Sequence, residues 1–258
     1  MADWSAAQYV KFEDERTRPA RDLLAHVPNH EPREVVDLGC GPGNTTQLLL
    51  ERFPHAHITG LDSSPDMIKN ARARLKGIAF EVADLTTWMP PPTQTVDVVY
   101  ANAVFQWIPG HETILPRLIS LLPEGGSLAI QMPDNLDEPS HVAMRIAAGT
   151  GPWAEKLKPA SGARTAIGSP TSYYQLLKPH CRRVDVWRTV YNHPLDGVGG
   201  IVEWFKGSGL RPFLNLLSEP EKADYLARYT EEIAPHYPVQ SDGKVLLAFP
   251  RLFIVATR

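Results

Sequence analysis

The feature that most constrains this chain is a glycine-rich turn between a short apolar strand and a helix-forming run. The segment Val35–Thr46 reads V-V-D-L-G-C-G-P-G-N-T-T. Glycines at alternate positions let the backbone turn sharply and approach a ligand closely. The free N–H groups at the start of the following helix favour a polar or anionic group. A strand, a glycine turn and a helix in this order predict a nucleotide-type binding unit in an α/β fold.

The spacing of the glycines separates two classes of cofactor. A dinucleotide site needs G-x-G-x-x-G, and Asn44 stands where its third glycine would be. The chain has D-x-G-x-G-x-G instead, which resembles motif I of the class I S-adenosylmethionine-dependent methyltransferases. The resemblance implies that Asp37 helps to hold the methionine end of the cofactor. It also implies that the glycines, which are Gly39, Gly41 and Gly43, pass beneath that end.

Two further apolar segments end in acids. Ile58–Asp62 places Asp62 at the carboxyl end of the second strand, where a carboxylate can accept both hydroxyls of a ribose. Phe80–Leu85 places Asp84 where it can accept a hydrogen bond from an exocyclic amine such as that of adenine. A surface acid and a turn cap are the respective alternatives. We also assign three neighbouring residues to the cofactor site: Ser63, Met67 and Leu85.

The fourth strand, Val96–Ala103, runs into the sequence V-F-Q-W-I-P. Its carboxyl end would lie at the ligand edge of an open parallel sheet. We therefore assign Asn102 and Gln106 to the cofactor and Trp107 to the substrate. A fifth strand follows at residues 127–132, and strands that alternate with helices predict a parallel, doubly wound sheet.

The rest of the chain completes a single domain. Its 258 residues, 43% of them hydrophobic, suit one large α/β domain with an insertion. We expect a mostly parallel, seven-stranded Rossmann-like sheet with a helical lid insertion. Its parts are a cofactor-covering segment at 1–30, a cofactor-binding core at 31–133, helices and strand six at 134–190, a helical substrate lid at 191–238 and the last strand at 244–257.

Composition excludes several classes of partner. A net charge of −3 provides no global basic field, so we expect no nucleic-acid or membrane partner, and no protein partner is evident. The start of the chain lacks the features of a signal peptide, and no apolar run is long enough to span a membrane. Two cysteines, Cys40 and Cys181, fit a reduced, cytoplasmic location. The nine histidines show no metal-ligand spacing, so no metal is expected.

Later motifs narrow the resemblance. They are D-S-S-P-D-M-I, N-A-V-F-Q-W, Q-M-P-D-N, D-V-W-R-T, S-G-L-R-P-F and the C-terminal L-L-A-F-P-R-L-F-I-V-A. With them the whole chain resembles the family of trans-aconitate methyltransferases. The resemblance implies transfer of a methyl group from S-adenosylmethionine to a carboxylate of trans-aconitate, giving the monomethyl ester and S-adenosylhomocysteine. An ionised carboxylate is already a nucleophile, so we expect no catalytic residue, only residues that position the reactants.

A tricarboxylate substrate requires cations. The candidates for substrate binding are the cations Arg16, Lys206 and Arg211, the aromatic wall Trp204, a hydroxyl donor at Tyr173 or Tyr174, and Tyr9 in an N-terminal flap. A guanidinium can hold a carboxylate in a bidentate pair. The alternative for each cation is a solvated surface position.

Three other functions stay open on the sequence. The first is a methyltransferase for a different small acid or for a metabolite hydroxyl, and a hydroxyl acceptor would need a base such as His193. The second is a nicotinamide oxidoreductase, against which the missing glycine argues. The third is a non-catalytic cofactor-binding protein, which a fold alone does not exclude.

Overall fold

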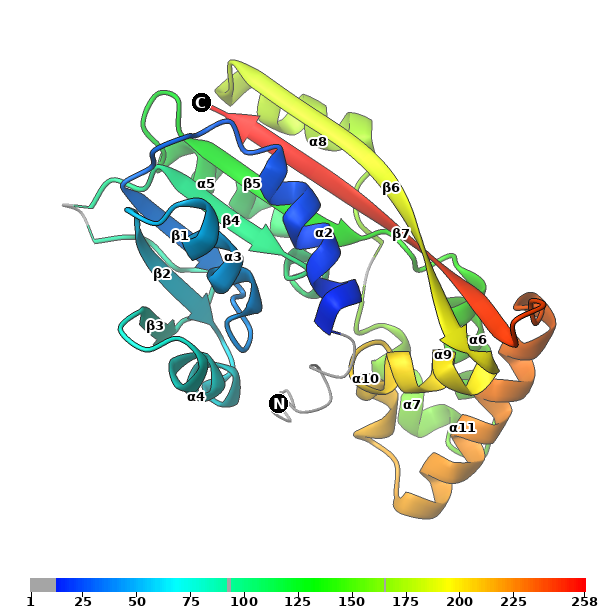
Figure 1. Ribbon diagram of the computed structural model, residues 1–258. Helices are drawn as coiled ribbons and strands as arrows, with labels where there is room; N and C mark the ends of the chain where they lie inside the picture. Colours follow the sequence, from blue (N-terminus) through cyan, green and yellow to red (C-terminus); the bar gives the residue numbers. More distant parts are fainter. Residues whose placement is uncertain (1–12, 92–93, 165) are drawn as a thin grey trace.

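The protein is built around one seven-stranded sheet, seen in a computed structural model that describes residues 13–91, 94–164 and 166–258. The strand order is β3-β2-β1-β4-β5-β7-β6 (Figure 1). The first five strands run parallel, and β7 is antiparallel to both of its neighbours. This arrangement confirms the predicted Rossmann-like sheet. The strands are β1 Glu34–Leu38, β2 His57–Asp62, β3 Ala79–Val82, β4 Val98–Asn102, β5 Ser127–Pro133, β6 Arg183–Asp196 and β7 Lys244–Thr257.

Helices cover both faces of the sheet. The α-helices are α2 Glu13–Ala25, α3 Asn44–Arg52, α4 Pro65–Arg74, α5 Ile114–Ser120, α6 Pro139–Thr150, α7 Ala154–Ser161, α8 Pro170–Leu177, α9 Gly197–Lys206, α10 Arg211–Leu214 and α11 Glu219–Ile233. Short 3₁₀ helices are η1 Phe105–Trp107, η2 His111–Thr113, η3 Lys178–His180 and η4 Ala234–His236. Helices α2 and α3 pack on one face, while α5 and α8 pack on the other (Figure 1).

Alternation along each strand supplies the two apolar faces. In β1, Val35 belongs to the cluster under α2 and α3, and Val36 belongs to the cluster under α5 and α8. Successive side chains of a strand point to opposite sides, so a strand that is buried on both faces needs apolar residues at consecutive positions. The β-branched runs of β1 and β4 meet this requirement.

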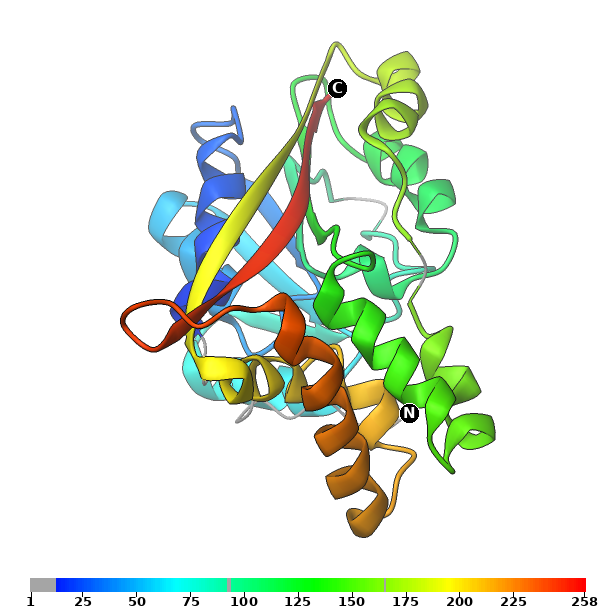
Figure 2. The same cartoon turned by 90° about the vertical axis from the view of Figure 1, so that its right-hand side faces the viewer.

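A helical cap stands at one end of the sheet, and we use this name for α6, α7, α9, α10 and α11 together. These helices share a hydrophobic cluster of their own with the far ends of β6 and β7 (Figures 1 and 2). The cap therefore combines two separate segments of the chain, whereas the sequence placed α6 and α7 outside the lid. Strand β6 also continues to Asp196, beyond residue 190, because it pairs with β7 along its whole length.

Among the described residues, no helix is both long enough and apolar enough to cross a membrane. Cys40 and Cys181 are both buried and free of disulfide bonds.

Gly60 and Gly149 form a matched pair for testing this packing. A Cβ at Gly60 would lie 2.5 Å from ring atoms of Phe80, so Gly60→Ala should lower the free energy of unfolding by about 1–3 kcal/mol. Gly149 lies in α6 with nothing within 4 Å of its Cβ position, so Gly149→Ala should raise that free energy by up to about 1 kcal/mol. Urea unfolding measures both. Equal effects of the two substitutions would contradict this packing.

Candidate active site

The glycine turn lies at the edge of the sheet where the parallel strands end. Gly39 N and Cys40 N both donate to Leu61 O, at 2.7 and 2.9 Å, and these bonds hold the turn against the end of β2. The three alternate glycines of the turn all have positive φ, between 56° and 92°. A Cβ at Gly41 would meet no atom within 4 Å, so open space lies beside this glycine. The turn thus combines a backbone that favours glycine with room for a ligand.

Asp37 braces the turn from below. Its carboxylate is fully buried, and Oδ2 accepts hydrogen bonds from the hydroxyls of Thr45 and Thr46, each at 2.7 Å. Burial raises the pKa of Asp37 to about 6, although the two hydroxyl donors oppose that shift. Oδ1 has no hydrogen-bond partner in the described part of the chain. Asp37 therefore fixes the first turn of α3, and any contact with a cofactor would use Oδ1.

Asp62 joins the turn to the next helix. Its Oδ2 accepts from Gly41 N at 3.0 Å, and its Oδ1 accepts from Ser64 N at 2.9 Å. Ser64 in turn caps α4, because its hydroxyl accepts from Met67 N at 3.2 Å. The side chain of Asp62 is half-buried beside the turn, at the place where the sequence put a ribose-binding acid. Of the two neighbours assigned with it, Ser63 is exposed and Met67 is buried.

Asp84 adopts a turn-capping geometry. Its Oδ1 accepts from Thr86 N at 2.9 Å and from the Thr86 hydroxyl at 2.7 Å. These hydrogen bonds hold the pKa of the exposed Asp84 carboxyl below its usual range. The adjacent Leu85 is buried in the core cluster. Without a ligand, Asp84 therefore caps a turn, which was the alternative to its role as a partner of adenine.

The end of β4 packs against the glycine turn. A Cβ at Gly39 would lie 2.6 Å from Val104 Cγ2, so this connection and the turn are in close contact. Ala103 has φ +56°, which is strained for a residue with a side chain. Gln106 Nε2 donates to Ala103 O at 2.6 Å, while Asn102 is buried next to it.

Several buried polar atoms at this edge have no hydrogen-bond partner within the described residues. They are Asn44 Oδ1 and Nδ2, Asn102 Oδ1 and Gln106 Oε1. Most buried polar groups in proteins are satisfied by protein or by water. Together with the open space at Gly41, this set fits a polar, nucleoside-like ligand at the carboxyl ends of β1, β2 and β4.

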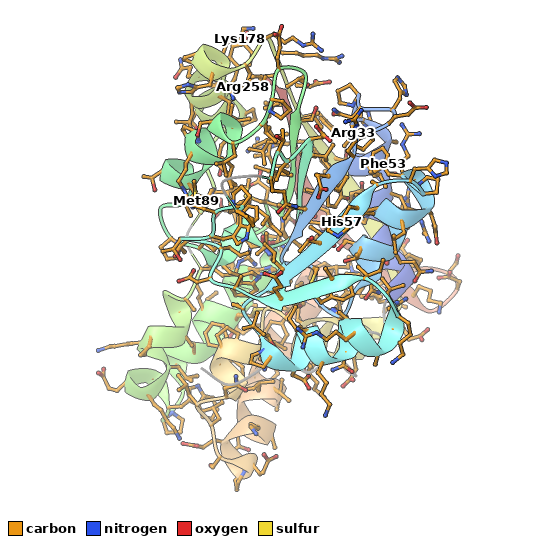
Figure 3. The ribbon with its side chains drawn as sticks, turned by 90° about the vertical axis from the view of Figure 1, so that its left-hand side faces the viewer. Arg33, Phe53, His57, Met89, Lys178 and Arg258 are labelled. Atoms are coloured by element: carbon orange, nitrogen blue, oxygen red, sulfur yellow. The ribbon has the colours of Figure 1, made fainter. Side chains whose placement is uncertain are left out.

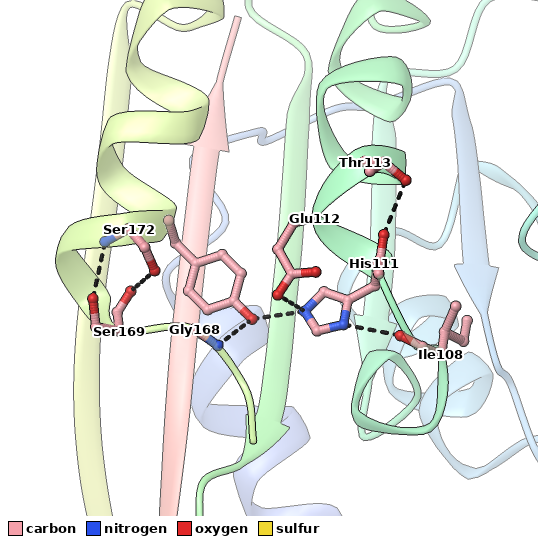
Figure 4. Close-up of polar contacts among 9 residues, drawn as sticks. Ile108, His111, Glu112, Thr113, Gly168, Ser169 and Ser172 are labelled. Carbon is pink, nitrogen blue, oxygen red and sulfur yellow. Dashed lines mark hydrogen bonds and ion pairs between the residues drawn. The ribbon is translucent and has the colours of Figure 1, made fainter. Parts of the chain in front are cut away.

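Tyr173 does not fit the predicted role of a substrate donor. Its side chain is fully buried, and its hydroxyl accepts from Gly168 N at 3.0 Å (Figure 4). His111 Nδ1 donates to Ile108 O at 3.1 Å, so Nε2 accepts from the Tyr173 hydroxyl at 2.6 Å. Tyr173 therefore anchors α8 to the sheet. The alternative, Tyr174, is exposed on the same helix.

The other predicted substrate residues are dispersed. Trp204 is buried in the cap core and stacks on His193 with ring centroids 4.5 Å apart, so it is no open wall. Lys206 Nζ lies 2.5 Å from Glu203 Oε1 in an ion pair. Arg211 is half-buried at the start of α10.

Trp107 ends η1, directly after β4. Tyr9 lies outside the described residues. Arg16 belongs to α2, and its side chain also lies outside the described part.

The structure adds two cations that the sequence motifs did not indicate. Arg251 on β7 is buried, and its Nη1 donates to Gln131 Oε1 at 3.1 Å. Arg164, in the connection between α7 and α8, has its guanidinium carbon 5.2 Å from the centroid of the Trp107 ring. Both residues approach the carboxyl ends of β4 and β5 from distant parts of the sequence. Arg251 lies within the C-terminal motif but was given no role in the site, and Arg164 lies in none of the motifs.

A cavity of about 660 Å³ lies at the opposite edge of the sheet, where the parallel strands begin. Residues 29–34 and Asp97 contribute to its lining, near the starts of β1 and β2, where Figure 3 labels Arg33 and His57. Asp97 Oδ2 accepts from Arg33 N and Glu34 N, at 2.7 and 3.0 Å. The Asp97 carboxylate thus holds neighbouring parts of the backbone together and is not left open for a ligand. We therefore place the active site at the glycine edge.

Known proteins resemble this chain both in sequence and in fold. A family model described as a methyltransferase domain matches residues 35–126. The chain is 56% identical to the trans-aconitate 2-methyltransferase of Rhodopseudomonas palustris strain BisB18, with 100% of both chains covered. It is 52% identical to the enzyme of the same name from Paracidovorax citrulli, covering 100% of this chain and 99% of that one.

A solved structure shows the same fold at low sequence identity. The YcgJ protein of Bacillus subtilis matches with a TM-score of 0.59 and 11% identity, over 93% of this chain and 98% of the other. The fold, the glycine edge and the matched domain place this chain among the methyltransferases. Within that class it belongs to the trans-aconitate 2-methyltransferase family, because the similarity to members of that name extends over its full length.

The raised pKa of Asp37 gives a testable pH dependence. Below pH 3.8, its ordinary pKa, the Asp37 carboxyl is neutral in the folded and in the unfolded protein. Between pH 3.8 and about pH 6 the carboxyl ionises only in the unfolded protein. The free energy of unfolding of the wild type therefore falls by about 3 kcal/mol over this range. Asp37→Asn stays neutral throughout. We therefore expect its free energy of unfolding, relative to wild type, to rise by that amount between pH 4 and 7. Urea unfolding at several pH values measures it, and a pH-independent difference would contradict the raised pKa.

Proposed function

We propose that this protein transfers a methyl group from S-adenosylmethionine to a carboxylate oxygen of trans-aconitate. The products are the monomethyl ester and S-adenosylhomocysteine. The observation that carries the proposal is the full-length similarity to proteins of that name, combined with a glycine edge built for a nucleoside-like ligand. Both are needed, because a fold by itself does not define an activity.

The cofactor would lie along the glycine edge. Asp62 would accept hydrogen bonds from the ribose hydroxyls. The side-chain oxygens of Asn102 and Gln106 would accept hydrogen bonds from donors of the cofactor. The glycine turn would pass beneath the methionine end, with Oδ1 of Asp37 facing it. Ser63, Met67, Asp84 and Leu85 complete the proposed set, on the side where adenine would lie.

The reaction needs alignment more than chemical activation. S-adenosylmethionine supplies a methyl group on a positively charged sulfur, and the acid supplies an ionised oxygen. One O–C bond forms, one S–C bond breaks and no proton is transferred. Holding two reactants in line can lower a barrier by roughly 7–11 kcal/mol at the ideal limit. The protein's task is therefore to bind the acid in one orientation and to exclude water.

Among the described residues, Trp107, Lys206 and Arg211 remain candidates for orienting the acid. Tyr9 and Arg16 complete that set from outside the described side chains. Tyr173 and Trp204 do not belong to it, because both are buried within packed cores.

A hydroxyl acceptor is disfavoured by the state of His193. Such a substrate would need a general base with a pKa near neutrality. Burial, with Arg251 and Arg18 nearby, lowers the pKa of His193 to about 4. His193 is also stacked between Tyr191 and Trp204. A small acid that needs no base suits the site better.

We further propose that the protein acts in the cytoplasm on this small molecule, with no nucleic-acid, membrane or protein partner. The two free cysteines support a reducing compartment.

A substrate panel tests the proposed function directly. With labelled S-adenosylmethionine, we expect methyl transfer to trans-aconitate to exceed transfer to cis-aconitate, isocitrate and citrate by at least roughly tenfold in kcat/KM. A different geometry misplaces the reacting oxygen and loses alignment. Mass spectrometry of the ester identifies the product. Preferential labelling of a hydroxyl, or of none of these acids, would refute the proposal.

Asp62→Ala tests the proposed ribose contact. Hydrogen bonds to a charged group contribute about 1.5–3 kcal/mol, so affinity for S-adenosylhomocysteine should fall by roughly 10- to 100-fold in calorimetry. Glu81→Ala is the matched control, because Glu81 is an exposed acid on the adjacent strand β3. An unchanged dissociation constant in Asp62→Ala would remove Asp62 from the cofactor site.

A further inference from the structure

An arginine pair without an acidic partner lies between the sheet and the cap. Arg164 and Arg145 form no ion pair with any Asp or Glu in the described part of the chain, and Arg145 Nη2 instead donates to Leu136 O at 2.9 Å. The half-buried lysines Lys206, Lys222 and Lys244 each have a carboxylate beside them. A partly buried guanidinium without an anion is costly, and the cost is relieved when an anion binds.

The partners of Arg164 are neutral. Its Nη1 lies 3.2 Å from His141 Nε2, and its Nη2 donates to Asn135 Oδ1 at 3.3 Å. Burial, with both arginines nearby, holds the pKa of His141 well below its usual range, so His141 adds no charge of its own. Two atoms of the group remain unused: Arg164 Nε and Asn135 Nδ2 are buried donors without a hydrogen-bond partner among the described residues.

A small cavity lies beside Arg164. It has a volume of about 30 Å³, and both arginines, His141, Gly209 and Pro212 contribute to its lining. That is the space of about one water molecule. A carboxylate head group entering it would displace little and would meet a planar guanidinium fork, which matches carboxylate geometry.

The position of the cluster separates it from the cofactor edge. Asn135 follows β5, and the Trp107 ring beneath the Arg164 guanidinium follows β4. The glycine turn and Asp62 lie at the ends of β1 and β2, on the other side of β4 from β5 in the sheet. An anion held by Arg164 would thus belong to the second reactant.

We propose that Arg164, supported by Asn135 and His141, binds one carboxylate of the acid substrate and thereby determines which carboxylate faces the methyl donor. This inference rests on the proposed function, and it adds a specificity-determining residue that none of the sequence motifs contains. Arg145 supplies a second positive charge at the same place.

Calorimetry on the complex with S-adenosylhomocysteine tests the assignment without requiring turnover. Arg164→Gln should weaken binding of trans-aconitate by about 30- to 1,000-fold, because a buried charged hydrogen-bond partner is lost. Arg164→Lys keeps the charge but not the fork and should lie between this variant and wild type. Affinity for S-adenosylhomocysteine should stay within about twofold in both. Arg228→Gln, on the exposed face of α11, is the matched control and should leave both affinities unchanged.

Three dicarboxylates identify the carboxylate that Arg164 holds. Itaconate, cis-glutaconate and mesaconate each lack a different carboxylate of trans-aconitate and otherwise keep its geometry. Arg164→Gln should weaken two of them as strongly as it weakens the tricarboxylate. It should leave the third nearly unaffected, because that analogue has no group for Arg164 to bind.

The possible failures are distinguishable. If wild type binds trans-aconitate but does not methylate it, the proposed function is wrong, and the binding data still decide the role of Arg164. Unchanged acid affinity in the folded Arg164 variants overturns this inference alone. An equal loss of affinity for S-adenosylhomocysteine also overturns it, because Arg164 would then act on the cofactor. If wild type binds no tricarboxylate, both proposals fail.

Discussion

The site depends on one half-buried carboxylate that joins two backbone segments. Asp62 accepts from Gly41 N and from Ser64 N, so it couples the glycine turn after β1 to the first turn of α4. Asp37 supports the same turn from below through two threonine hydroxyls. Two acids therefore shape the loop on which a cofactor would lie, and the surrounding parallel strands bring Asn102 and Gln106 to it. The positions of these groups follow from the direction of the strands.

Much of this edge could be predicted from the sequence, because its signals are local. A strand, a glycine turn and a helix occupy consecutive positions, and Asp62 follows the next strand along the chain. The structure has Asp62 beside the turn, as this order predicts. The mostly parallel sheet and the helices on both of its faces also follow, since apolar runs alternate with helical runs.

The rest depends on contacts that join distant segments. Arg164 lies 57 positions after Trp107 in the chain, and nothing in its neighbourhood marks it as buried beside an indole ring. Tyr173 is the opposite case, because its hydroxyl suggested a donor to the substrate but the side chain is fully buried. His111 uses that hydroxyl, and a partner 62 positions away cannot be read from spacing. The sequence predicted a helical lid at 191–238 but not that α6 and α7 pack with it, because those two helices precede β6 in the chain.

Strands β6 and β7 have a mechanical consequence. Each has 14 residues, and they pair from the level of the first residue of β5 to the base of the cap. Two strands that are hydrogen-bonded to each other along this length form a stiff connection, so they hold the cap in a fixed orientation to the sheet on that side. The cap is also joined to the rest of the domain by the connections from β5 to α6 and from α7 to α8. Arg164 lies in the second of these connections and is therefore held to the sheet independently of the long strand pair.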